Sequence, residues 1–149
     1  MKATQIIVIT GDFKKGEIIW NHLNEHSYAT TLITGFGNFS KGRLYGFDHE
    51  GEPRVLQIER FGLAFVDQLT AAGFVPKWRT GARLVSRLHL MMPCVAIASN
   101  AVSNDKLLSA GATHCMNDEE MLPFMETVLP TIAVRARRRK PIVKSLTGS

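Results

Sequence analysis

The sequence predicts one α/β domain, in which helices cover both faces of a parallel sheet of five strands. Short apolar runs rich in β-branched residues alternate along the chain with segments whose apolar residues recur at helical spacing. Several of these runs are apolar on both faces, as is typical of strands buried at the centre of a parallel sheet. The length of 149 residues is that of a single domain able to bury a core of its own.

The first half of the chain begins with a strand over residues 5–10, which ends at Gly11 and Asp12. Apolar residues at helical spacing then predict an amphipathic helix over residues 13–26. A second strand is expected over residues 28–34. The region from there to residue 60 is expected to be the least regular part of the domain and to replace or shorten the second helix, because residues 35–51 hold five of the twelve glycines.

Two alternatives remain for the end of this irregular region. A short helix could begin at Pro53, since proline suits a first helical position, and end near Gly62. Residues 43–47 could instead pair with residues 54–58 in a hairpin that turns at residues 49–52. The sequence does not decide between the helix and the hairpin.

The second half continues the alternation of strands and helices. A third strand, residues 63–66, ends at Asp67, and a loop over residues 68–80 follows. Asn117 and Glu120 form a capping pair for the last helix, which Pro130 should interrupt. The remaining elements are a helix from Gly81 to about residue 90, a strand over 93–98, a helix over 103–110 and a short strand over 113–116.

Right-handed crossovers leave few topologies for such a chain. The common small solution is the flavodoxin-like three-layer sandwich with strand order 2-1-3-4-5, whose ligand site lies at the carboxyl ends of the first and third strands. Asp12 and Asp67 follow those two strands, so both carboxylates are expected at this site.

The positive charge is concentrated at the C-terminus. The formal net charge of +5 comes from 18 basic and 13 acidic residues, and residues 135–149 contain six of the basic residues and no acidic one. We therefore divide the chain into a domain over residues 1–134 and a basic tail over 135–149. The tail is a candidate nucleic-acid contact, or else a solvated extension; the contact would use Arg135, Arg137, Arg138, Arg139 and Lys140.

The composition favours a cytoplasmic protein without a membrane contact. No apolar run approaches the ~18 residues of a membrane-spanning helix, and the first apolar run is too short for a signal sequence. Cys94 and Cys115 have neither the number nor the spacing of a disulfide framework or a metal site, so we expect free thiols.

Four segments resemble the receiver domains of bacterial two-component response regulators. The similarity extends over roughly residues 4–130, is most specific between residues 64 and 112 and is poor from 35 to 60. It is carried by Ala64-Phe-Val-Asp67, by Gly81-Ala-Arg-Leu-Val-Ser-Arg-Leu88, by Pro93-Cys-Val-Ala-Ile-Ala-Ser-Asn100 and by Leu107-Leu-Ser-Ala-Gly-Ala112.

This resemblance implies roles for three residues. Asp67 would be the phosphoacceptor, and the hydroxyl of Ser99 would contact the phosphoryl group. A Mg²⁺ ion would be held by Asp67 together with an acidic pair, which falls on Gly11 and Asp12, so that Asp12 alone supplies a carboxylate there. We expect no resident cofactor, with Mg²⁺ at Asp12 and Asp67 as the alternative.

Three positions depart from the family pattern. Besides Gly11, the family's lysine falls on Asp118, which reverses a charge that should face the phosphoryl group, and the family's switch aromatic falls on Cys115. Lys77 or Arg79 could supply the missing cation from the loop. Asp118 could also lie beyond the site, as part of the start of the last helix.

The retained Asp67 and the altered cation site together indicate a pseudo-receiver, a regulatory module and not an enzyme. We expect it to signal by protein–protein contact, independently of standard phosphorylation, with a sensor kinase or a downstream effector as partner. The last helix is also a candidate homodimer surface. The alternatives are a genuine phosphoacceptor at Asp67 in a phosphorelay, and nucleic-acid binding through the tail.

Overall fold

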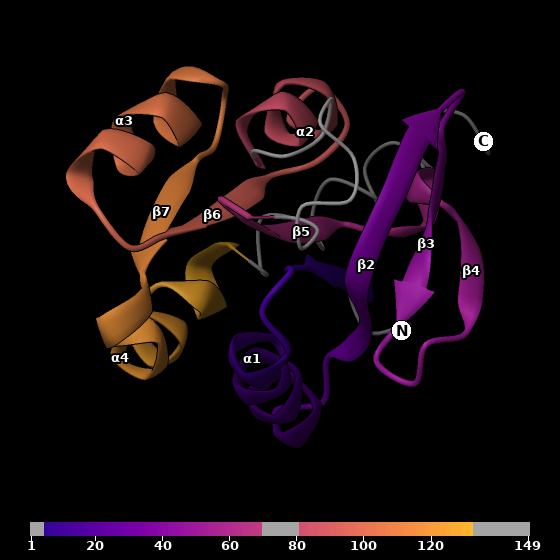
Figure 1. The fold of residues 1–149 in the computed structure, drawn as a ribbon. Helices are drawn as coiled ribbons and strands as arrows, with labels where there is room; N and C mark the ends of the chain where they lie inside the picture. The colour runs from indigo at the N-terminus through magenta and orange to yellow at the C-terminus, as the bar shows by residue number, and fades with distance from the viewer. Residues whose placement is uncertain (1–4, 70–80, 133–149) are drawn as a thin grey trace, which may run out of the picture.

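Five strands lie side by side and parallel at the centre of the molecule (Figure 1). The computed structural model describes residues 5–69 and 81–132. The strands are β1 (Gln5–Ile9), β2 (Ala29–Ser40), β5 (Leu63–Asp67), β6 (Cys94–Ala98) and β7 (His114–Asn117). Their order across the sheet, β2-β1-β5-β6-β7, confirms the predicted flavodoxin-like order 2-1-3-4-5.

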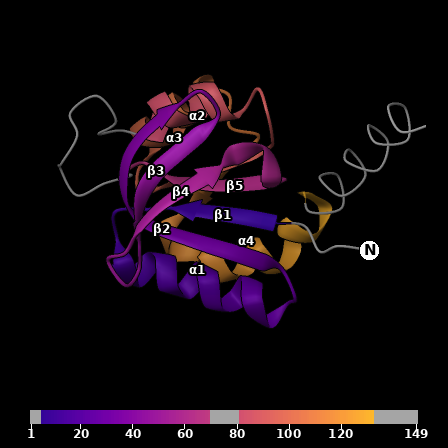
Figure 2. The same ribbon diagram turned by 90° about the vertical axis from the view of Figure 1, so that its right-hand side faces the viewer.

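Helices cover both faces of this sheet and bury a separate core on each. They are α1 (Phe13–Glu25), α2 (Gly81–Leu88), α3 (Ala101–Ser109) and α4 (Met121–Thr127). In Figure 2, α1 and α4 lie on one side of the sheet and α2 and α3 on the other. Strand β1 contributes to both cores, since Ile6 and Val8 face α1 and α4 while Ile7 and Ile9 face the opposite way. This double burial explains why β1 is apolar on both faces.

The region over residues 35–60 differs from the expectation, because it forms sheet instead of an irregular segment. Strand β2 continues to Ser40, and two antiparallel strands, β3 (Arg43–Asp48) and β4 (Pro53–Gln57), extend the sheet beyond it. The hairpin alternative is therefore confirmed and the helix from Pro53 is wrong. A 3₁₀ turn, η1 (Ile58–Arg60), follows β4 and leads into β5.

Glycines in this region serve close packing and a tight turn. A Cβ atom at Gly46 would lie 2.8 Å from the carbonyl oxygen of Gly35, so glycine at position 46 permits the close approach of β2 and β3. Lys41 and Gly42, which join the two strands, have φ angles of 52° and 75°. Positive φ at both positions is the geometry of a type I′ hairpin turn. A high glycine content was thus a misleading sign of irregularity.

None of the helices in the described part of the chain has the length and apolarity needed to cross a bilayer.

The hairpin β3–β4 should contribute to the stability of the domain through the buried side chain of Leu44. This side chain is 0% exposed in the core beneath α2 and α3, whereas Val55 on β4 is 60% exposed. We expect Leu44→Ala to lower the free energy of unfolding by about 2–5 kcal/mol and Val55→Ala to change it by less than about 0.5 kcal/mol. Urea denaturation followed by circular dichroism measures both values, and equal effects would contradict a hairpin anchored in this core.

Candidate functional site

The site is centred on Asp67, the last residue of β5. All five residues of this strand are buried, and Asp67 is itself only 1% exposed. Removal of the carboxylate from water raises its pKa above the ordinary 3.8, although contacts with Thr10 and Lys15 oppose the rise. The polar neighbours of Asp67 therefore determine how much charge this position can hold.

Thr10, directly after β1, is the first of these neighbours. Its hydroxyl donates a hydrogen bond to Asp67 Oδ2 over 2.6 Å, and Thr10 Oγ1 accepts one from the backbone N–H of Asp12 over 3.0 Å. Thr10 is fully buried. Because β1 and β5 are adjacent and parallel, their carboxyl ends place these two side chains together.

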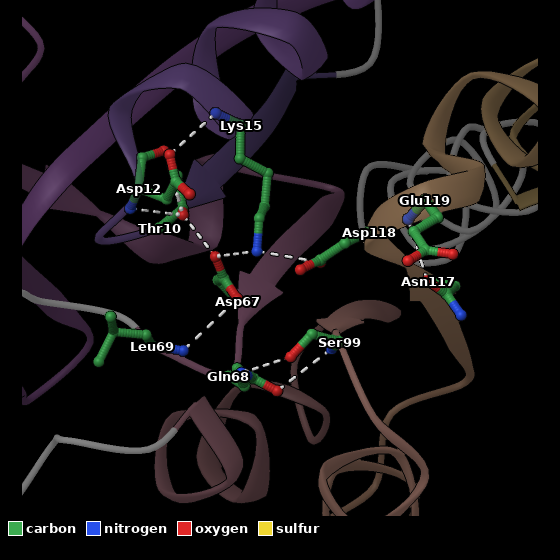
Figure 3. A network of polar contacts seen from close by, with 10 residues as sticks. All are labelled: Thr10, Asp12, Lys15, Asp67, Gln68, Leu69, Ser99, Asn117, Asp118 and Glu119. Atoms are coloured by element: carbon green, nitrogen blue, oxygen red, sulfur yellow. Dashed lines mark hydrogen bonds and ion pairs between the residues drawn. The ribbon is translucent and has the colours of Figure 1, made fainter.

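Lys15 supplies a cation to the site from the first turn of α1 (Figure 3). Its Nζ atom lies 3.2 Å from Asp67 Oδ2 and 2.9 Å from Asp118 Oδ1. Burial alone would lower the pKa of Lys15, but its ion pairs with Asp118 and Asp67 outweigh burial and raise the pKa above 10.5. The ammonium group thus stays charged and links the end of β5 to the residue after β7.

Asp12 is positioned as the N-cap of α1. Its carboxylate accepts a hydrogen bond from the backbone N–H of Lys15 over 3.2 Å, the usual role of an aspartate at a helix start. The neighbouring Gly11 donates its N–H to the carbonyl of Leu69 over 2.7 Å. The contacts of Asp12 are therefore directed toward the helix, and Lys15 is the charged group that reaches Asp67.

Ser99 lies next to Gln68 instead of Asp67. The Gln68 amide donates to Ser99 Oγ over 3.1 Å, and the Ser99 N–H donates to Gln68 Oε1 over 3.3 Å. Gln68 in turn is fixed by its N–H, which donates to the carbonyl of Ile97 in β6. Ser99 is exposed beside the site, with its hydroxyl hydrogen-bonded in this arrangement.

Asp118 lies within the site and begins η3 (Asp118–Glu120), a 3₁₀ turn before α4. Asn117 Oδ1 caps this turn by accepting the N–H of Glu119 over 3.0 Å. The side chain of Asp118 extends to Lys15 and is 27% exposed. The pKa of the nearby Cys115 thiol is raised to about 11 by burial and by the charge of Asp118, which keeps the thiol protonated and poorly nucleophilic.

The other expected cations fall outside the described residues. Lys77 and Arg79 belong to the segment 70–80, and the tail residues Arg135, Arg137, Arg138, Arg139 and Lys140 belong to 133–149.

No family model and no curated protein matches the sequence. Solved receiver domains, in contrast, share its fold. A two-component response regulator from Clostridium difficile is 16% identical, with a TM-score of 0.61 over 89% of this chain and 97% of that one. A CheY-like receiver domain protein from Methanospirillum hungatei is 13% identical, with a TM-score of 0.57 over 93% and 99%. Vibrio cholerae chemotaxis protein CheY4 is 12% identical, with a TM-score of 0.54 over 85% and 99%.

These comparisons define the class of the fold as that of the CheY-like response-regulator receiver domain. The resemblance seen in the sequence is thereby confirmed at the level of the fold. The hairpin β3–β4 lies where the resemblance in the sequence was poor, between residues 35 and 60.

The residues around Asp67 do not fit the Mg²⁺ ion that the fold implies. Mg²⁺ requires several oxygen ligands in an octahedral arrangement, most of them carboxylates, phosphates or water. Here an ammonium group lies 3.2 Å from Asp67 Oδ2, the Thr10 hydroxyl donates to the same oxygen, and Asp12 caps a helix. The described residues contain no cluster of three or more carboxylate, histidine or cysteine side chains suited to a metal ion.

Lys15 is the charged group of the site that the sequence analysis did not identify. A signal was present, because α1 has two lysines and no acidic residue in its first turn. Cations are unfavourable there, where the helix dipole is positive. A lysine at this position gains stability only from acidic partners elsewhere in the fold, which are Asp67 and Asp118 here.

Replacing Lys15 should change the titration of Asp67. We expect Lys15→Met to raise the pKa of Asp67 further, because the buried carboxylate loses its cation, and Lys14→Met, on the exposed neighbour, to leave it unchanged. A folded pKa above 3.8 means that this group favours the folded state most at low pH and less as pH rises through that pKa. In the Lys15→Met protein, the loss of stability with rising pH should therefore continue to a higher pH. NMR titration of the Asp67 carboxyl carbon measures the pKa, and urea unfolding at several pH values measures the stability.

The ion pair between Lys15 and Asp118 should appear as energetic coupling. In a double-mutant cycle with Lys15→Met and Asp118→Asn, we expect a coupling free energy of about 1 kcal/mol, because the two groups are in contact and partly buried. The same cycle between Lys14→Met and Asp118→Asn provides the control. A coupling no larger than that of the control would show that the Lys15–Asp118 contact does not form in solution.

Proposed function

We propose that this chain is a regulatory receiver-like domain that signals by protein–protein contact without the standard phosphorylation of Asp67. The observation that carries the proposal is the position of Lys15 Nζ, 3.2 Å from Asp67 Oδ2 and 2.9 Å from Asp118 Oδ1. An ammonium group of the protein thus lies against the carboxylate at which phosphoryl transfer would need a metal ion and room for the phosphoryl group.

Charge balance supports the same conclusion. Two carboxylates share one ammonium group, so the network of Asp67, Lys15 and Asp118 already carries a net negative charge. A phosphoryl group would add nearly two further negative charges at close range. Transfer to a carboxylate depends on positioning and charge neutralisation, and the cation here is already neutralised by its two partners.

The proposed partner-binding surface is α4 together with the neighbouring edge strand β7. The inner side of α4 is fixed in the core by Met121 and Met125, while Leu122 is 47% exposed. A protein partner such as a sensor kinase or an effector, or a second copy of the chain, would bind this surface and favour one conformation of the domain.

A phosphorelay acceptor is the second candidate function. It is favoured by the retention of a cation at Asp67, because a Lys15 released from Asp118 could contact a phosphoryl oxygen. The basic residues 135–140 make nucleic-acid binding by the tail a third candidate, resting on sequence alone.

Treatment with acetyl phosphate and Mg²⁺ distinguishes the first two functions. We expect the intact mass of the protein to stay unchanged, because Lys15 and Asp118 oppose phosphoryl transfer to Asp67. A receiver domain known to autophosphorylate serves as the positive control. Stoichiometric gain of one phosphoryl group, abolished by Asp67→Asn but not by Asp105→Asn on the exposed side of α3, would establish the phosphoacceptor instead.

A further inference from the structure

We propose that the hairpin β3–β4 presents a binding platform for single-stranded nucleic acid, a function beyond that proposed for the Asp67 site. The platform is the sheet face formed by Arg43, Tyr45 and Phe47 of β3 with Pro53 and Val55 of β4. Exposed and buried residues alternate along β3. Arg43, Tyr45 and Phe47 therefore point away from the core into which Leu44 packs. Tyr45 is 37% and Phe47 50% exposed.

The two rings lie on paired strands. Tyr45 pairs with Val55 across the antiparallel ladder, and Phe47 pairs with Pro53. On the other side, Phe47 lies over Gly35 of β2, where a Cβ atom would come within 3.3 Å of the ring. Successive aromatic side chains on one face of a sheet can each stack on a base, at little conformational cost.

Positive charge lies at one end of the platform. A shallow depression of about 510 Å³ is lined by Asn38, Ser40, Lys41, Arg43 and Tyr45. Neither Lys41 nor Arg43 forms an ion pair with a residue in the described ranges. A nucleoside stacked on Tyr45 would therefore place its phosphate near two cations, Lys41 and Arg43, and near the hydroxyl of Ser40.

The acidic residues of the hairpin are placed so that they do not cancel this charge. Asp48 pairs with Arg54, 3.6 Å away, and both belong to the alternate positions that face away from the platform. Glu50 and Glu52 lie at the β3–β4 turn, at the end of the hairpin opposite Lys41.

The sequence of β3 also matches the pattern of sheets that bind single-stranded RNA. Arg43, Tyr45, Gly46 and Phe47 follow the order basic, aromatic, small, aromatic, in which the aromatic residues contact bases. Leu44, Asp48 and Glu50 depart from that pattern. Lys41 and Arg43 next to the exposed rings favour nucleic acid over a second copy of this chain, whose matching surface would bring the same charges together.

The test measures binding of the full chain to a fluorescent single-stranded polyuridine by anisotropy. We expect Tyr45→Leu and Phe47→Leu each to weaken binding by about fivefold or more, since leucine retains apolar area but cannot stack. Arg43→Gln should lower the slope of log affinity against log salt by about one. Phe13→Leu is the matched control, because Phe13 is an aromatic residue of similar exposure, 47%, on α1.

Two further measurements separate the platform from the basic tail and from self-association. Ultraviolet cross-linking should attach uridine to the peptide that contains Tyr45, and binding to a duplex should be unaffected by Tyr45→Leu. Cross-links confined to residues 135–149, or equal losses for Phe13→Leu and Phe47→Leu, would overturn the proposal. So would a concentration-dependent dimer that Phe47→Leu abolishes without a change in polyuridine affinity.

Discussion

The ammonium group of Lys15, shared between Asp67 and Asp118, is the interaction on which the character of the site depends. It allows a carboxylate that is 1% exposed to remain in the core, and it connects α1 to the start of η3. Removing one partner of a buried ion pair costs more than the pair contributes, because the remaining charge is left without compensation. The pocket is therefore held together by the contacts of Lys15 with the two carboxylates.

The hairpin β3–β4 lies at the other edge of the sheet, away from this pocket. Strands β3 and β4 extend β2 away from β1, and Leu44 attaches them to the core beneath α2 and α3. One face of the hairpin thus contributes to stability, while Tyr45 and Phe47 remain exposed on the other. A domain built in this way can carry two separate binding surfaces, one near Asp67 and one on the hairpin.

Much of the fold was readable from the sequence, because β1, β5 and β6 are buried on both faces and their apolar runs leave little ambiguity. The hairpin was harder to predict, since Gly35, Gly37 and Gly46 look like loop residues although close strand packing requires them. Asp67 was expected at the centre of the site from its place after a strand. Lys15 was not, because the distance from α1 to Asp118 depends on how the helices pack, which local sequence patterns do not encode.

The ion pairs between α1 and the segment after β7 also constrain which substitutions the pocket tolerates. Reversing Asp118 to lysine by itself would place two ammonium groups around one buried carboxylate. Losing Lys15 first would leave two carboxylates facing each other in a nearly dry pocket. Either single change leaves a buried charge without its partner and so gives a less stable protein, which makes the charges at positions 15 and 118 dependent on each other.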